Sequence, residues 1–158
     1  MGIYLNQNNI MFFKDVNSDI YVDKTLLIEQ SNKYINTNSQ YVCISRPRRF
    51  GKSMAANMLT AYYSRGCDSK EMFSNLKIAK ADSFEKHLNK YNVISFDMQK
   101  FLVKTENVKE MLELMEQKIL KDIRKEFSGI IDDEEDLMST LEIAFAETGI
   151  PFVFIIDE

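Results

Sequence analysis

Apolar and polar positions follow one another along the chain in blocks that predict strands separated by helices. Short apolar runs with the length of buried strands lie at 41–45, 93–97 and 152–156. Between them, apolar side chains recur at the three- or four-residue spacing of helices with one buried face, over 54–62, 108–127 and 137–148. Strands that alternate with helices usually pair in parallel through crossover helices. The pattern therefore predicts an α/β fold in which helices flank a parallel sheet.

The first 38 residues are predicted to form a lead-in segment with a helix of its own. Residues 1–20 are mostly polar and rich in asparagine. They surround the apolar run at 10–13, where we expect either a short strand or a docking segment. Asp23 is a suitable N-cap for a helix that continues to about Tyr34.

Capping signals mark further helices. Asn107 and Glu110 have the spacing of a capping box at the start of the longest helical pattern. Asp82 and Glu85 repeat that spacing within 70–90, where one or two short helices are expected.

The glycines separate helix ends from a different kind of site. The chain has five glycines; Gly2 is terminal, and Gly66, Gly129 and Gly149 stand where helices are expected to stop. Gly51 is different, because a helix should begin there. A residue without a side chain is needed at such a place if a phosphate group has to approach the backbone closely.

Gly51 belongs to the stretch from Arg46 to Ser53, which reads Arg-Pro-Arg-Arg-Phe-Gly-Lys-Ser. Its end matches the phosphate-binding pattern G-x-x-x-x-G-K-[ST], but Arg46 stands in place of the first glycine. Pro47 partly compensates, because its ring fixes φ at about −65° and stiffens the turn. We predict a loop that binds the phosphates of ATP or GTP. The alternative is a basic loop with a chance Gly-Lys-Ser before a helix.

The expected roles follow from charge and reach. Backbone N–H groups from about Arg49 to Ser53 would surround the β-phosphate at the positive end of the following helix. Lys52 would lie between the β- and γ-phosphates and take part in catalysis, while the Ser53 hydroxyl would bind Mg²⁺. The full set expected to contact the nucleotide is Pro47, Arg48, Arg49, Phe50, Gly51, Lys52, Ser53 and Met54.

The last apolar run ends in two carboxylates, Asp157 and Glu158. Residues 152–156 are apolar on both faces, as expected for a central parallel strand that helices cover. Asp157 would then point into the same crevice as the loop and hold Mg²⁺, usually through water. Glu158 could polarise the water that attacks the γ-phosphate. The alternative is a buried strand that leads into ordinary surface acids.

The pair of carboxylates also bears on domain organisation. A glutamate directly after this aspartate is common in ATPases in which another strand separates the loop strand from the aspartate strand. That separating strand would follow Glu158. We therefore expect the 158 residues to be a P-loop-type sheet truncated after the aspartate strand, with a lead-in at 1–38 and an incomplete nucleotide-binding core at 39–158. Such a piece should expose unpaired strand edges and apolar surface.

Composition narrows the remaining possibilities. The net charge of −4 gives no global attraction to nucleic acid or to anionic membranes. Cys43 and Cys67 are too far apart for a metal clip, and Cys43 is expected to be a small buried thiol in a reducing cytosol. No apolar run approaches about 20 residues, and the N-terminus lacks the order of a signal peptide. The expected location is therefore the cytoplasm.

Three stretches of the chain resemble the AAA-ATPase-like family of bacterial proteins. They are Tyr-Val-Asp-Lys-Thr at 21–25, the loop with its preceding serine at 45–53, and Phe-Ile-Ile-Asp-Glu at 154–158. In that family an arginine at the position of Arg46 is ordinary, and the last two stretches correspond to Walker A and Walker B motifs. The resemblance implies binding of ATP with Mg²⁺ and its hydrolysis. It also implies that a C-terminal domain similar to PD-(D/E)XK nucleases often follows, outside this chain.

Several assignments stay open at this level. In related ATPases the residues at Asp23, Lys24 and Thr25 often contact the base, and helix capping is the alternative. Asp97, at the end of the second strand, could face the nucleotide or act as a structural cap. The only histidine, His87, is expected to be packed or exposed rather than a ligand.

Three functions compete on these residues. The first is an Mg²⁺-dependent ATPase that switches an attached effector domain. The second is a nucleotide-binding scaffold without turnover. The third is a nucleic-acid-binding module that uses Arg46, Arg48 and Arg49 on phosphates. The oligomeric state is left open.

Overall fold

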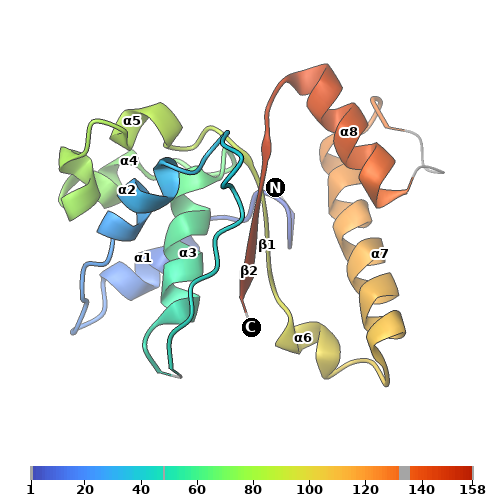
Figure 1. Ribbon diagram of the computed structural model, residues 1–158, viewed down its shortest axis with the longest axis horizontal. Helices are drawn as coiled ribbons and strands as arrows, with labels where there is room; N and C mark the ends of the chain where they lie inside the picture. The colour runs from blue at the N-terminus through green and yellow to red at the C-terminus, as the bar shows by residue number, and fades with distance from the viewer. Residues whose placement is uncertain (1, 48, 132–135, 158) are drawn as a thin grey trace.

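The computed structural model describes residues 2–47, 49–131 and 136–157, and it shows helices on both faces of a small parallel sheet (Figure 1). The sheet contains β1 (Asn92–Asp97) and β2 (Phe152–Asp157). The two strands run parallel in register, with Asn92 opposite Phe152 and Asp97 opposite Asp157. The predicted α/β class and the parallel pairing are thereby confirmed for these two strands.

The helices differ widely in length. The first group in the chain comprises α1 (Ile10–Val16), α2 (Leu26–Asn32), α3 (Lys52–Tyr63), α4 (Lys70–Ser74), the 3₁₀ helix η1 (Lys77–Lys80) and α5 (Phe84–His87). After β1 follow α6 (Gln99–Leu102), α7 (Val108–Glu126) and α8 (Leu137–Thr148).

One face of the sheet packs against α3 and the helices around it. Val93 and Ile155 point to this face, and they join one apolar cluster with side chains of the first helix group, such as Phe12, Ile28 and Tyr62. The lead-in segment therefore contributes α1 and α2 to this core, since Phe12 and Ile28 are both fully buried in it.

The opposite face packs against α7 and α8. Ile94 and Phe96 point to this side and share a second apolar cluster with Ile119 and Ile123 of α7 and Ala144 of α8. Because successive side chains of a strand alternate between faces, β1 contributes to both clusters. This alternation explains why β1 carries apolar side chains on both of its faces.

The direction of α3 is fixed at its C-terminal end. The N–H of Tyr91, just before β1, donates to the carbonyl of Tyr63 at 3.0 Å. Ser64 and Tyr91 form an isolated bridge at the same point. Helix α3 thus ends where β1 begins, and it runs antiparallel to both strands (Figure 1). Its amino end consequently lies at the end of the sheet where β1 and β2 finish.

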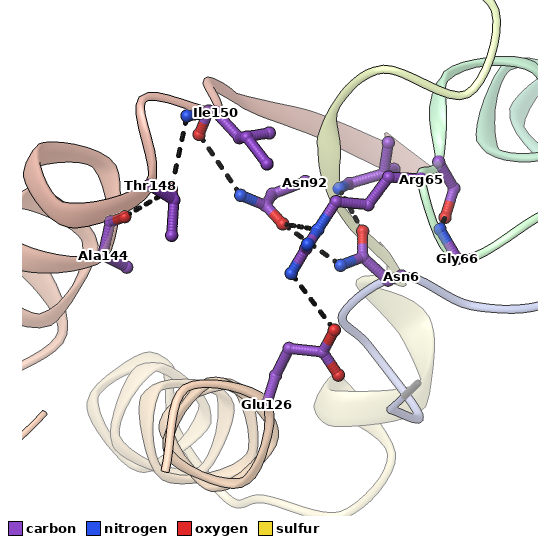
Figure 2. A network of polar contacts seen from close by, with 10 residues as sticks. Asn6, Arg65, Gly66, Asn92, Glu126, Ala144, Thr148 and Ile150 are labelled. Carbon is purple, nitrogen blue, oxygen red and sulfur yellow. Dashed lines mark hydrogen bonds and ion pairs between the residues drawn. The ribbon is translucent and has the colours of Figure 1, made fainter. Parts of the chain in front are cut away.

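A polar network ties the elements together at the other end of the sheet (Figure 2). Arg65 follows α3 and donates from Nε to Oδ1 of Asn92 at 2.5 Å and from a terminal nitrogen to Glu126 at 3.2 Å. Asn6 donates to the same Asn92 oxygen at 3.2 Å. The Asn92 amide donates to the carbonyl of Ile150 at 3.2 Å. The network therefore joins the start of both strands to the ends of α3 and α7.

The N-terminal residues pair with the free side of β1. Leu5 and Ile94 form an antiparallel bridge, and the N–H of Asn6 donates to the carbonyl of Val93 at 2.8 Å. Strand β1 thus has a hydrogen-bonded neighbour on each side. A glycine is required at position 66, next to this pairing, because a Cβ there would lie 2.6 Å from the Asn6 carbonyl oxygen.

Several capping predictions are confirmed. The Asn107 side chain accepts from the N–H of Glu110 at 3.0 Å, and the Glu110 carboxylate accepts from the Asn107 amide at 2.9 Å. A further cap that was not predicted is Asp136, which accepts from the N–H of Ser139 at 2.8 Å at the start of α8. Gly149 ends α8 in a left-handed conformation with φ 66°.

Other local predictions are wrong. Residues 10–13 are helical rather than a strand, as part of α1. Helix α3 ends before Ser64, so Gly66 serves close packing and not the helix stop. Asp82 and Glu85 do not cap α5, whose N-cap position is Ser83 without a side-chain cap. Glu85 instead accepts from Lys70.

The expected strand at 41–45 is absent, and this is the largest correction. The segment is irregular and exposed, with Tyr41 90% exposed. Cys43 is likewise exposed rather than buried. A strand is defined by hydrogen bonds to a neighbouring strand, and this segment forms none with β1 or with the other edge of β2. Among the described residues, β2 pairs only with β1.

Strand β2 is also less covered than its sequence indicated. Ile155 is buried against the α3 side, but Phe154 and Ile156 are 49% and 56% exposed. These two side chains alternate onto the face of α7 and α8, where only Phe152, near the start of the strand, joins the apolar cluster. The prediction that helices cover both faces of this strand is therefore wrong for its second half.

Candidate functional site

Helix α3 begins at a left-handed glycine. Gly51 is the N-cap residue, with φ 76° and ψ 35°, and its carbonyl accepts the first helical bond from the N–H of Ala55 at 3.0 Å. A residue with a Cβ adopts this conformation at a cost of roughly 1–2 kcal/mol. Gly51 is thus needed for its backbone freedom, whereas the sequence analysis had expected a glycine here for the close approach of a phosphate.

The loop before α3 contains a second left-handed residue. Arg49 has φ 70°, which is unusual for a residue that is not glycine, asparagine or aspartate. Left-handed residues in turns are typical of concave backbone sites that bind anions through successive N–H groups. The N-terminus of a helix adds partial positive charge at the same place. The backbone of this loop is therefore suited to an anionic ligand.

Two lysines donate to carbonyl oxygens of the loop. Lys52, the first residue of α3, donates from Nζ to the Arg46 carbonyl at 3.0 Å. Lys24, from the lead-in segment, donates from Nζ to the Phe50 carbonyl at 2.8 Å. Their ammonium groups bring positive charge to both ends of the loop.

The neighbours of Lys24 are held by the protein itself. Asp23 accepts from the N–H and hydroxyl of Thr25 at 2.8 and 2.6 Å, and from the N–H of Lys77 at 2.8 Å. Burial alone would raise the pKa of Asp23, but these hydrogen bonds bring the pKa below its ordinary value. The buried Thr25 hydroxyl accepts from the N–H of Ile78 at 3.1 Å. Asp23 and Thr25 thus support the backbone here. The prediction that Asp23 is the N-cap of α2 is wrong, because Thr25 occupies that position without a side-chain capping bond.

The remaining predicted loop residues lie around the same turn. Pro47, Arg49, Phe50 and Ser53 are exposed, while Met54 is partly buried in the first turn of α3. Arg46 is exposed as well. Arg48 lies outside the described residues.

The ends of the two strands meet this end of α3. Asp157 is opposite Asp97 in the parallel register. Because side chains alternate along a strand, both lie on the same face of the sheet as Ile155, which is the face that packs against α3. Asp97 accepts from the N–H of Gln99 at 2.9 Å, so it has the structural capping role that was one of its two alternatives. Asp157 is partly exposed. Glu158 lies outside the described residues.

The oxygen donors here suit one kind of metal. The Ser53 hydroxyl and the Asp157 carboxylate are hard ligands of the type that Mg²⁺ prefers, and Mg²⁺ takes only one or two such groups from a protein in nucleotide sites. Within the described ranges, no group of three or more His, Cys, Asp and Glu side chains could hold a metal ion. The donor set therefore fits a metal carried by a phosphate ligand.

A separate hollow lies away from this loop. It has a volume of about 250 Å³ and is lined by residues of α2 and α5 and their neighbours, namely Glu29, Asn32, Lys33, Asp82, Ser83, Lys86 and His87. His87 is buried, and its Nδ1 is 2.5 Å from the Tyr91 hydroxyl. Burial first, and then Lys86, lowers the pKa of His87. Its packed role agrees with the expectation from sequence.

Sequence reasoning missed the contact between Lys24 and the loop. The two residues that it joins are 26 positions apart, and no periodic pattern connects them. The signal that could have pointed to it is the short polar stretch at 23–25, whose middle residue has a long cationic side chain.

No helix in the described part of the chain has the length and apolar character needed to cross a membrane.

The chain belongs to the AAA-ATPase-like family, described as predicted AAA-ATPases, whose model matches residues 9–158. This membership is consistent with ATP binding, and it confirms the resemblance inferred from the three sequence stretches. No curated protein and no solved structure gave a match.

Proposed function

We propose that this chain binds ATP at the carboxyl end of its sheet, with the phosphates on the loop 46–53. One observation carries the proposal. The amino end of α3 begins at the left-handed Gly51 and lies at the end of the sheet where Asp157 closes β2. Ligands of parallel α/β sheets bind outside the carboxyl ends of the strands, and helix amino ends favour phosphate.

The phosphate contacts follow from this arrangement. Backbone N–H groups from Arg49 to Ser53 would bind the β-phosphate, with the helix dipole favouring its charge. Lys52 would leave the Arg46 carbonyl, a neutral partner, for the β- and γ-phosphates, because its ammonium is attracted more strongly to their negative charge than to a carbonyl dipole.

Mg²⁺ would be held by the Ser53 hydroxyl and by Asp157. When bound, it would neutralise part of the charge on the phosphates. The chain's own contribution would be a hydroxyl from α3 and a carboxylate from the end of β2.

Hydrolysis is the second part of the proposal. Glu158 follows Asp157 and would accept a proton from water as that water attacks the γ-phosphorus. The bond between that phosphorus and the bridging oxygen would break, giving ADP and phosphate. We further propose that this turnover switches an effector domain, the role that the family resemblance suggested.

Binding is tested with a fluorescent ATP analogue and Lys52→Ala. Loss of a charged hydrogen bond to phosphate should weaken affinity by about tenfold to a hundredfold. Lys121→Ala is the matched control, because Lys121 is an exposed lysine on α7, on the other side of the sheet. Equal binding by the unaltered protein and Lys52→Ala would contradict the proposal.

Turnover is tested by phosphate release from ATP, with and without Mg²⁺. Glu158→Gln should bind ATP as tightly as the unaltered protein but release phosphate far more slowly. Tight retention of ATP without any phosphate release by the unaltered protein would favour the non-hydrolysing scaffold. DNA binding that depends steeply on salt and is indifferent to ATP would favour the nucleic-acid module.

A further inference from the structure

The contact between Lys24 and Phe50 joins two parts of the chain that the sheet does not connect. Lys24 lies in the turn before α2, and Phe50 lies directly before Gly51, the N-cap residue of α3. The ammonium of Lys24 donates to the Phe50 carbonyl at 2.8 Å. This carbonyl belongs to the peptide unit that leads directly into Gly51.

The position of Lys24 is determined on both sides. Asp23 is bonded to the N–H of Lys77, and Thr25 is fully buried with its hydroxyl bonded to the N–H of Ile78. Both partners belong to η1, which packs in the apolar cluster on the α3 face. The backbone of Lys24 is thus attached to the core, while its side chain is exposed and extends to the loop.

The ammonium also lies close to the glycine itself. A Cβ built on Gly51 would be 3.0 Å from Nζ of Lys24. The lysine therefore lies against the left-handed turn at which α3 begins. Lys52 contacts the loop at a different carbonyl, that of Arg46, so the two lysines hold opposite ends of the segment 46–50.

A lysine is well suited to such a contact. Its flexible four-carbon stem ends in a compact charge with three donors, so one N–H can hold a carbonyl while others remain for a second acceptor. Phe50 is an exposed residue, and at such a position a neutral side chain would compete poorly with water for a carbonyl.

We propose that Lys24 is a positioning residue of the nucleotide site: it holds the Phe50 carbonyl and thereby fixes the left-handed turn from which the phosphate-binding end of α3 begins. This inference rests on the proposed function. It assigns the polar stretch at 23–25 a divided role, with Asp23 and Thr25 attaching the stretch to η1 and Lys24 attaching it to the loop.

The test compares Lys24→Met and Lys24→Arg with the unaltered protein. Hydrogen exchange of the amides at 49–52 measures how firmly the turn is held without any nucleotide. Titration with a fluorescent ATP analogue measures the effect on the site. Lys33→Met is the matched control, because Lys33 is an exposed lysine at the C-cap of α2 whose Nζ donates within its own turn, to Oε1 of Gln30 at 3.1 Å.

Lys24→Met should exchange these amides faster and bind the analogue on the order of tenfold more weakly, with an unchanged melting temperature. Lys24→Arg should restore most of the affinity, because a guanidinium can still donate to the carbonyl. Lys33→Met should change neither measurement.

The outcomes separate this inference from the proposed function. If the unaltered protein binds the analogue and Lys24→Met matches it in both affinity and exchange, the positioning role is overturned. If Lys24→Met accelerates exchange but the unaltered protein binds no nucleotide, the proposed function fails while the attachment of the loop stands. A lower melting temperature with unchanged affinity would show a role in stability only, and would also overturn the inference.

Discussion

Replacing Gly51 by alanine perturbs the turn that starts α3 while leaving every charged group in place. The backbone there has φ 76°, which a residue with a Cβ adopts at a cost of roughly 1–2 kcal/mol. The added Cβ would lie 3.0 Å from Nζ of Lys24. Since that nitrogen ends a flexible side chain, it can move away, and the backbone term should dominate.

The strain can appear in two measurements. If the loop of the variant relaxes to another conformation, nucleotide binding must restore the left-handed turn. The cost of roughly 1–2 kcal/mol is then taken from the binding free energy, and affinity falls by about five- to thirtyfold. If the loop cannot relax, the same energy is lost from the free energy of unfolding. We expect the first result, because the loop is exposed at the surface.

The assay is titration with a fluorescent ATP analogue together with urea unfolding. Gly149→Ala is the matched control, because Gly149 is also a left-handed helix cap, with φ 66°, and a Cβ there would meet nothing within 4 Å. Gly149 lies beyond α8, near the start of β2 and away from the loop. Gly149→Ala should lower stability and leave affinity unchanged. The reasoning is refuted if Gly51→Ala changes neither affinity nor stability while Gly149→Ala is destabilised.

Three further predictions concern the supports of the fold. Asp23→Ala removes the acceptor for the N–H of Lys77 and should lower the free energy of unfolding by about 1–3 kcal/mol in urea titrations; an unchanged midpoint would contradict the bond seen here. Asn107→Ala should cost about 1 kcal/mol through loss of the α7 cap, measured in the same way, whereas Asn107→Asp should retain most of the stability. Burial is the main reason that the pKa of Tyr62 is raised to about 12, above the value of about 10 expected in the unfolded chain. The stability that the neutral Tyr62 hydroxyl contributes is therefore complete below pH 10 and is lost as the pH rises through 12. Thermal melts across that range should show the decline, and Tyr62→Phe should show a smaller one.

The sequence allowed the helices with strong local signals to be predicted. The capping box at Asn107 and Glu110 marks the start of α7, and Gly149 marks the end of α8. Both signals act within a few residues, so they do not depend on the rest of the fold. Gly51 was likewise singled out from its local position, as a glycine where a helix should begin, but its left-handed conformation was known only from the structure.

The strands show where such prediction stops. Residues 93–97 and 41–45 are both short apolar runs, but only the first is a strand in the structure. A strand is defined by the hydrogen bonds of its neighbours, and β1 finds β2 on one side and the N-terminal residues on the other. Apolar composition says nothing about whether an edge is available.

The candidate site divides in the same way. The sequence by itself determined where a phosphate-binding loop is to be expected, at 46–53, and it singled out Gly51 within that loop, because both follow from residue types and their local spacing. Only the tertiary structure decided that α3 runs antiparallel to the strands, which brings its amino end to the end of the sheet where β2 finishes at Asp157. It alone decided that Lys24 reaches the loop across 26 positions. Such contacts depend on how distant elements pack, and no pattern of neighbouring residues encodes that packing directly.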